Sequence, residues 1–179
     1  QNSRILKKGS NMDASAFDLY IKILRKELPI GESFDLLERK LIIGGRRASM
    51  FFVDGLTDGE KTQRILAYLM AVPAASLCGV SSSHRFIETV LPFLDTTIIE
   101  PKDGSFGAAA APLTQEQAED CCNQMLPKLY AGLVPLLVEG LDRIIIIDCR
   151  DYPSRSVEEP DKEKTLRGAK DGFTENFMD

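Results

Sequence analysis

The sequence predicts an α/β fold: a layered sandwich in which a mixed β-sheet, containing at least one hairpin, is flanked by helices. Two observations lead to this prediction. Apolar residues recur at helical spacing in several segments, and these segments alternate along the chain with short, densely apolar runs typical of strands. Helices interleaved with strands, two of which are joined directly through a glycine pair, pack most simply as helices on a sheet.

The composition is that of a globular protein. Hydrophobic residues make up 44% of the 179 positions and charged residues 27%, so the chain can build a core. The formal net charge of -5, without a basic stripe, argues against a nucleic-acid partner. No apolar run reaches the roughly 20 residues that cross a bilayer. We therefore expect this stretch of chain to be soluble, with no nucleic acid bound.

The first predicted element is an amphipathic helix over residues 15–28. Phe17, Ile21 and Leu24 recur at helical spacing, while lysine and arginine residues lie largely on the other face. A proline and a glycine follow and end the pattern. With the residues before it, this helix forms an N-terminal segment over residues 1–30.

Two apolar runs on either side of Gly44 and Gly45 predict a β-hairpin. A glycine pair supplies the positive φ angles that a tight two-residue turn needs. We place the strands near residues 36–43 and 48–54. The predicted sheet therefore contains at least one antiparallel pair.

Two helices and a short strand are predicted in the middle of the chain. Apolar residues recur in helical register over residues 58–71 and 82–94, and Ser82 or Ser83 can cap the second helix. The stretch "DTTIIEP" then predicts a strand that stops at Pro101. The run of Gly, Ala and Pro that follows is predicted to be a surface loop.

The remaining elements are one helix and two strands. Thr114 and Gln117 have the capping-box spacing, and Pro127 is expected to kink or shorten the helix that they open. Two apolar runs around "EGLD" follow. The second contains Ile144 to Ile147, a continuous run that predicts a strand covered on both faces.

The sequence "FFVDGLTDGEKTQRIL" comes nearest to a nucleotide-binding motif. Gly55, Lys61 and Thr62 align with the phosphate-binding pattern G-x-x-x-x-G-K-[ST], but Glu60 occupies the second glycine position. A carboxylate there would repel phosphate. We interpret the segment as an ordinary connection between a strand and a helix.

The sequence contains no pattern that assembles a catalytic or metal-binding constellation. His84 follows three serines, but nucleophilic catalysis also needs an orienting group and an oxyanion site, so a capped helix start with a surface histidine is the simpler interpretation. We predict no enzyme activity, no cofactor and no metal. The cysteines lack metal-ligand spacing and are expected to be buried structural residues: Cys78, Cys121, Cys122 and Cys149.

The end of the chain carries the most specific pattern. The sequence "IIIIDCRDYPSRSVEEPDKEKTLRGAKDGFTEN" resembles a segment of the spore germination receptor A-subunit family, of the GerA and SpoVAF type. That segment reads as a strand ending in Asp, then Arg-x-Tyr-Pro-x-Arg, Glu-Glu-Pro and Arg-Gly-x-x-Asp-Gly-Phe-x-Glu. The stretch "GESFDLLERKLIIGGRRASMFFVDGLTD" is similar to the first hairpin of the same family's amino-terminal domain. The resemblance covers most of the chain from about residue 31 onward.

The resemblance implies a division of the chain and a function. An α/β subdomain over residues 31–152 would be followed by a linker, residues 153–179, into a second subdomain and a membrane domain that lie beyond this chain. The receptors of the family respond to nutrient germinants such as amino acids, sugars or nucleosides. The A-type subunits act with B-type and C-type subunits and form oligomers in the spore inner membrane, with this domain on the cytosolic (core) side. The implied role is subunit assembly and transmission of the germinant signal to the membrane domain.

We expect the linker to be mechanical and to serve as a contact surface. Its prolines hold an extended passage, its glycines allow sharp turns, and its opposite charges can pair between neighbouring subdomains or subunits. The alternative is a solvated linker without an energetic role. The candidate linker and interface residues are Arg150, Arg155, Glu158, Glu159, Pro160, Arg167, Gly168, Asp171, Gly172, Phe173 and Glu175.

A second functional hypothesis makes the domain a binding module for a small molecule, either a germinant or a metabolite. Such a module needs a concave pocket with convergent polar groups. In an α/β sheet the usual place is at the carboxyl ends of the strands, which here points to Asp54 or Asp148.

Overall fold

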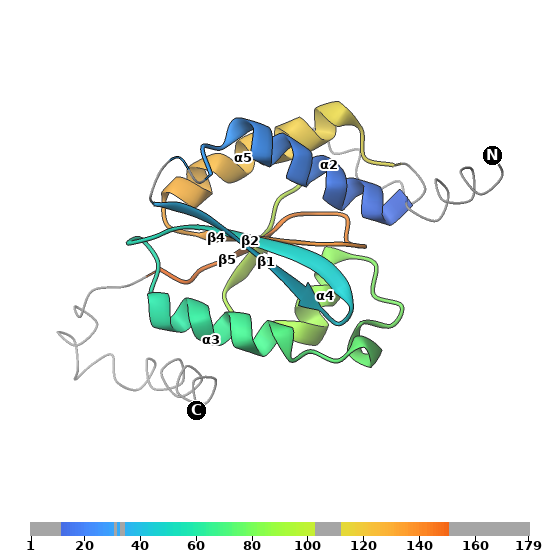
Figure 1. Cartoon of the computed structure of the whole chain (residues 1–179). Coiled ribbons are helices and arrows are strands. Elements are labelled where there is room, and N and C mark those ends of the chain that lie inside the picture. The colour runs from blue at the N-terminus through green and yellow to red at the C-terminus, as the bar shows by residue number, and fades with distance from the viewer. Residues whose placement is uncertain (1–11, 31, 33–34, 103–111, 151–179) are drawn as a thin grey trace, which may run out of the picture.

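The computed structural model describes residues 12–30, 32, 35–102 and 112–150 (Figure 1). None of the helices in these ranges has the length and apolar character that crossing a bilayer requires. In chain order the elements are α2 (Met12–Glu27), β1 (Leu36–Ile43), β2 (Arg46–Val53), α3 (Gly59–Met70), the 3-10 helix η1 (Ala74–Leu77), α4 (Ser83–Val90), β3 (Thr96–Ile98), α5 (Gln115–Tyr130), β4 (Val134–Val138) and β5 (Ile145–Ile147).

The described strands form one five-stranded sheet in the order β1-β2-β4-β5-β3. Every pairing among the described strands is antiparallel. Helices α2 and α5 cover one face of the sheet, and α3 and α4 cover the other (Figure 1). The predicted layered α/β sandwich with a hairpin-containing sheet is therefore confirmed, but the mixed pairing expected for the sheet is not found among the described strands, which pair only antiparallel.

Gly44 and Gly45 form the predicted turn between β1 and β2, with φ angles of 56° and 85°. The two strands pair along all eight residues of β1. Arg46, the first residue of β2, donates hydrogen bonds to the carbonyls of Leu77 (2.9 Å) and Val80 (2.6 Å). These bonds tie the hairpin to the segment that connects η1 with α4.

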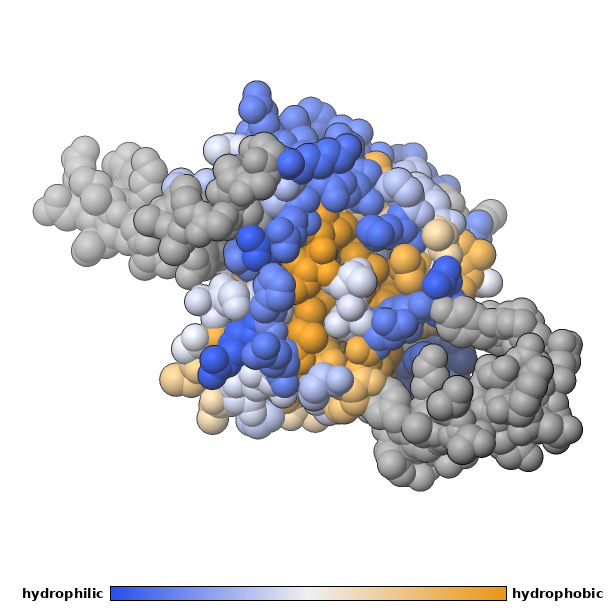
Figure 2. Space-filling view, turned by 180° about the vertical axis from the view of Figure 1, so that it is seen from behind, coloured by the Kyte–Doolittle hydropathy of each residue, from blue (hydrophilic) through white to orange (hydrophobic). Residues whose placement is uncertain are grey.

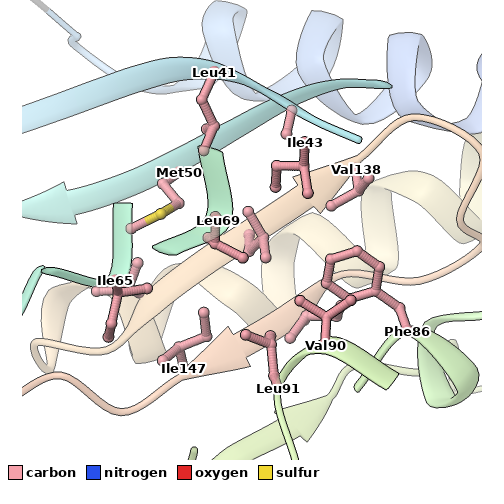
Figure 3. Close-up of a cluster of buried hydrophobic side chains, with 14 of the residues drawn as sticks. Leu41, Ile43, Met50, Ile65, Leu69, Phe86, Val90, Leu91, Val138 and Ile147 are labelled. Carbon is pink, nitrogen blue, oxygen red and sulfur yellow. The ribbon is translucent and has the colours of Figure 1, made fainter. Parts of the chain in front are cut away.

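Two hydrophobic clusters hold the layers together. The first lies between the sheet and helices α3 and α4 and includes Met50, Ile65, Phe86 and Ile147 (Figure 3). The second lies between the sheet and helices α2 and α5. Successive residues of a strand point to opposite faces, so Met50 belongs to the first cluster and its neighbour Phe51 to the second. All residues of β5 are buried, which confirms a strand covered on both faces.

Capping side chains fix the starts of three helices. Asp58 caps α3, and Ser82 caps α4. Thr114 and Gln117 form the predicted capping box of α5. The expected shortening of α5 at Pro127 does not occur, since the helix continues through the proline to Tyr130.

A buried polar cluster joins the start of α4 to the turn between β4 and β5. Ser83 is fully buried, and its Oγ donates to the carbonyl of Arg143 (2.8 Å) and accepts from the N–H of the same residue (3.1 Å). The N–H of Ser83 donates to Oδ1 of Asp142 (3.1 Å). From the opposite layer, the hydroxyl of Tyr20 donates to the carbonyl of Asp142 (3.0 Å). This turn is therefore bonded to both helical layers.

Candidate functional site

The chain leaves the sheet at the end of β5, directly before the segment that the sequence predicts to be a linker. Asp148 accepts three hydrogen bonds from Arg150: from the backbone N–H (3.1 Å), from Nε (3.1 Å) and from Nη2 (3.0 Å). A guanidinium group that donates hydrogen bonds from two nitrogens to one carboxylate is held in a defined orientation as well as attracted by the opposite charge. The side chain of Arg150 is therefore held in place at the exit of the chain.

Two neighbouring segments hold the backbone of this exit. Arg150 forms an antiparallel bridge with Thr57, and the N–H of Asp58 donates to the carbonyl of Cys149 (2.8 Å). Gly132, in the turn before β4, lies against the exit, because a Cβ at this position would come within 3.1 Å of Cγ of Arg150. We call these contacts, together with the bonds between Asp148 and Arg150, the exit clamp.

Cys149 is a structural residue of the exit clamp. Burial, the largest influence, raises the pKa of its thiol to about 12. A thiol with such a pKa carries little thiolate at neutral pH and is a poor nucleophile. The prediction that this cysteine is structural agrees with its burial.

The loop between β2 and α3 does not offer a phosphate site at the helix start. The carboxylate of Asp58 accepts hydrogen bonds from the N–H groups of Glu60 and Lys61, both at 3.1 Å. These are the N–H groups that a phosphate would need. The interpretation of this segment as an ordinary strand-to-helix connection therefore agrees with its geometry.

The remaining cysteines and the histidine are placed as follows. Cys121 and Cys122 are buried, as predicted. Cys78 is exposed, so the expectation of burial is wrong there; it follows η1, a short helix of which only Leu77 is buried. His84 is exposed in the first turn of α4. Within the described ranges, no group of three His, Cys, Asp or Glu residues could hold a metal ion.

Arg150 is the one predicted linker and interface residue within the described ranges. The others lie outside them, so their role stays a prediction. They are Arg155, Glu158, Glu159, Pro160, Arg167, Gly168, Asp171, Gly172, Phe173 and Glu175.

Asp54 and Asp148, the predicted pocket residues, lie at the same edge of the sheet. β2 and β5 run in the same direction, because both pair antiparallel with β4 between them. Asp54 is exposed, and its N–H donates to the carbonyl of Asp35 (2.6 Å). The carboxylate of Asp148 is engaged by Arg150. A pocket at these two residues stays a prediction.

A groove of about 430 Å³, which sequence reasoning missed, lies between α2 and the β1–β2 hairpin. Phe17 and Ile21 give it an apolar lining, and Arg25, Lys40 and Arg47 add charge. The only available signal was the alternation of charged and apolar residues along the two strands. That alternation does not predict which helix covers the hairpin. The groove exists only because α2 does so.

Ion pairs order the walls of this groove. Nη2 of Arg25 lies 2.8 Å from Oε2 of Glu38, and Oγ of Ser49 donates to the same oxygen at 2.8 Å. Burial alone would raise the pKa of Glu38, but the hydrogen bonds from Arg25 and Ser49 outweigh it, so this pKa lies below its ordinary value. Nη2 of Arg47 lies 3.0 Å from Oε2 of Glu139, and this hydrogen bond lowers the pKa of Glu139.

The described part of the chain defines the class of protein: an α/β domain with one antiparallel sheet between two helical layers, whose last described strand is followed by the exit clamp. Comparison with known proteins then gives the family. A family model described as "Bacillus/Clostridium GerA spore germination protein" matches residues 22–179. Because the match covers most of the chain, the chain belongs to this family, and the resemblance inferred from the sequence is confirmed.

Two curated relatives from Bacillus subtilis (strain 168) are similar to the chain. The first is Stage V sporulation protein AF, 27% identical over 154 residues, which cover 86% of this chain and 27% of that protein. The second is Spore germination protein KA, 22% identical over 152 residues, which cover 83% of this chain and 24% of that protein. The chain therefore spans about a quarter of the length of these relatives.

Both relatives are named for sporulation or germination, and neither is named for an enzymatic activity. A solved structure is also similar: the N-terminal domain of the A subunit of the Bacillus megaterium spore germinant receptor GerK3. Its sequence identity is 14% and its TM-score 0.46, and the match covers 74% of this chain and 91% of that one.

Proposed function

We propose that this domain acts, without catalysis, in the assembly of a spore germination receptor and in the transmission of the nutrient signal to the receptor's membrane domain. The exit clamp is the observation that supports this role. A segment that leaves a domain from a fixed point follows the movements of the domain. A segment that leaves from a loose end absorbs such movements through its free backbone dihedrals.

The proposal includes partners and a location. The partners are receptor subunits of the B and C types and further copies of the same subunit. Membrane attachment belongs to the part of the protein beyond this chain, and the domain lies on the cytosolic (core) side of the spore inner membrane. Residues 153–179 form the linker and contact surface, in which Arg167 and the charged residues around it pair with neighbouring subdomains.

The substitution Arg150→Ala in the full-length protein tests the proposal. Spores that carry it should germinate several times more slowly in response to nutrient, at an unchanged level of the subunit. Stability should fall by roughly 1–3 kcal/mol, since the Arg150 side chain is 39% exposed but that of Asp148 only 13%, and a largely buried carboxylate loses this partner. Germination rates, immunoblots of the spores and the unfolding temperature of the purified domain measure these three quantities.

Arg64→Ala is the matched control. Arg64 pairs with Glu60 on the surface of α3 (Nη2 to Oε2, 3.3 Å), and its side chain is 36% exposed. The substitution removes the same type of group from an ion pair that includes neither Asp148 nor Arg150. Normal germination of the Arg150→Ala spores, or equal defects in both variants, would contradict the proposed role of the exit clamp.

The groove between α2 and the hairpin supports small-molecule binding as a second candidate function. Its volume of about 430 Å³ suits a small ligand. The lining combines the apolar ring of Phe17 with Arg47 and Asp18, whose charges pair with each other (Nη2 to Oδ1, 3.1 Å), so a charged ligand would have to compete with this ion pair. A thermal-shift titration with amino acids, sugars and nucleosides tests this candidate, because a ligand that binds the folded chain raises its unfolding temperature.

A further inference from the structure

Among the described residues, the two outer strands of the sheet, β1 and β3, each have one edge without a neighbouring strand. An edge strand has backbone N–H and C=O groups that can pair with another chain. Natural proteins usually keep such edges short. β3 has three residues, but β1 has eight. β1 is therefore a long template for pairing.

The outward groups of β1 follow from its hydrogen bonds to β2. In an antiparallel pair, alternate residues bond to the partner strand, and the residues between them direct their N–H and C=O groups away. The N–H of Asp54 donates to the carbonyl of Asp35, so the odd-numbered residues of β1 bond to β2. Glu38, Lys40 and Ile42 therefore direct their backbone groups outward. Ile42, the last of these residues, is 54% exposed.

β1 also carries a local positive charge in a chain of net charge -5. Arg39 and Lys40 are both exposed. Neither forms a salt bridge with another described residue. A strand that docks on this edge gains from carrying negative charge.

The opposite edge of the same sheet has the complementary charge. Asp95 and Glu100 stand on either side of β3, are exposed, and form no salt bridge within the described ranges. The N–H of Ile99 bonds to Ile144, so the backbone groups of Ile98 point outward. Figure 2, seen from behind the view of Figure 1, shows an apolar strip between hydrophilic regions on this side of the molecule.

Lys40 and Asp95 lie on the same face of the sheet. Lys40 lines the groove beside α2. Asp95 comes two residues before Thr97, so their side chains lie on the same face of the sheet. Thr97 pairs with Ile146, a residue of the cluster beneath α2 and α5. Directly paired residues share a face. If two copies in the same orientation extend one sheet, these opposite charges stand on the same side of the junction.

We propose that β1 of one copy of this chain pairs edge to edge with β3 of a second copy, so that one sheet continues across both. The inference rests on the proposed assembly role, for which it names the contact surface. Pairing of β1 with β1 is disfavoured, because the run Arg39-Lys40 would then face its own copy, and like charges opposite one another destabilise a sheet. Each pair leaves a free β1 and a free β3, so assembly continues to rings or longer arrays.

The contact is expected to be weak in isolation, because β3 offers only three residues. Interfaces below about 1,200 Å² belong to transient complexes. Sedimentation velocity on the 179-residue chain should therefore show a mass that rises with concentration, between about 10 μM and about 1 mM. Low salt should strengthen the association, since exposed charges are screened at high ionic strength.

A charge exchange tests the two edges together. Lys40→Glu and Asp95→Lys should each weaken association at least about tenfold, a change of 1.4 kcal/mol. Mixing the two single variants should restore association, because the reversed β1 of one then meets the reversed β3 of the other. The controls are Lys22→Glu on α2 and Glu88→Lys on α4, which change the same charges at exposed helical positions instead of on or beside the edge strands. They should leave association unchanged.

A backbone test separates strand pairing from a contact made by charge alone. Ile42→Pro removes an outward N–H without removing a bond to β2, and Ile42→Val retains it. The proline variant should be monomeric at unchanged unfolding temperature. If the proline variant is unfolded instead, recovery of association on mixing Lys40→Glu with Asp95→Lys decides whether the two edges meet.

Three results would overturn the inference: a monomer at all concentrations, equal effects in the controls, or no recovery on mixing. Association through another surface or with another partner would appear as insensitivity to Lys40→Glu. A monomeric chain together with impaired germination of the Arg150→Ala spores would overturn edge pairing and leave the proposed function standing. Association that depends on the charges of Lys40 and Asp95, together with normal germination of the Arg150→Ala spores, would support edge pairing and contradict the proposed role of the exit clamp.

Discussion

At the β1–β2 end of the sheet, two strands of eight residues each are joined by a two-residue turn, whereas β5 and β3 at the other end have three residues each. The long strands are neighbours in sequence. The short strands are separated along the chain by α5 and β4. One end is therefore specified by local sequence and the other by contacts between distant residues.

The polar contacts repeat this difference. Glu38 and Ser49, at the hairpin end, are 11 positions apart. Ser83 and Asp142, at the other end, are 59 positions apart and form part of the buried cluster. Short strands supply few ladder hydrogen bonds, so specific side-chain contacts must help to fix the position of β5. We expect substitutions to be most costly where those contacts are buried.

Ser83→Ala should show the largest effect, because it removes the hydroxyl that serves both the N–H and the carbonyl of Arg143. A buried polar group left without a partner costs about 1–3 kcal/mol, so the loss of unfolding free energy should be roughly 2–4 kcal/mol. Urea denaturation of the purified chain measures it.

Ser82→Ala is the matched control, because it removes the hydroxyl of the neighbouring residue. Ser82 accepts only from the N–H of Arg85 at the start of α4, and the loss of an N-cap costs about 1 kcal/mol. Equal losses in the two variants would show that the buried cluster contributes no more than an ordinary helix cap.

The same difference explains which parts of the fold could be predicted. The glycine pair and the alternating pattern placed β1 correctly, and they placed the start of β2 two residues late, because Arg46 and Arg47 do not look like strand residues. The capping box of α5 could also be predicted, because its two residues are close together in the sequence. The position of β4 between β2 and β5, and the link from Ser83 to Asp142, depend on distant contacts that no local pattern encodes.

The candidate site divides in the same way. Asp148 and Arg150 stood out because they belong to the family's terminal pattern. Their partners in the exit clamp, Thr57 and Gly132, come from two other parts of the chain and have no local signature. The groove was missed for the same reason, since its walls come from a helix and a hairpin that the sequence does not pair.

Gly44→Ala tests the hairpin end and should have a smaller effect than Ser83→Ala. A residue other than glycine in the left-handed region costs about 1–2 kcal/mol, and a Cβ at Gly44 would also come within 2.7 Å of Cδ1 of Leu77. We expect a total loss of about 2 kcal/mol, since the methyl group of Leu77 can move aside.

Gly45→Ala separates the two causes, because nothing lies within 4 Å of a Cβ at Gly45. Only the backbone cost remains there. In a Leu77→Ala background, the loss caused by Gly44→Ala should shrink, while that caused by Gly45→Ala should not. Equal losses in both backgrounds would mean that the turn and η1 are not packed as the structure shows.

The smallest expected effect is the pH dependence of the pair between Arg25 and Glu38. The pKa of Glu38 in the folded chain lies below its ordinary value of 4.5, so its contribution to stability is fully present above pH 4.5 and is lost as the pH falls through the folded pKa. The side chain of Arg25 is 45% exposed, which limits the coupling to about 1 kcal/mol or less.

A double-mutant cycle with Arg25→Gln and Glu38→Gln, followed by urea denaturation at pH 7 and near pH 3, measures this coupling energy. The coupling energy should be present at pH 7 and fall towards zero in acid. A coupling that persists in acid would mean that packing of the two side chains, and not their charge, joins α2 to β1.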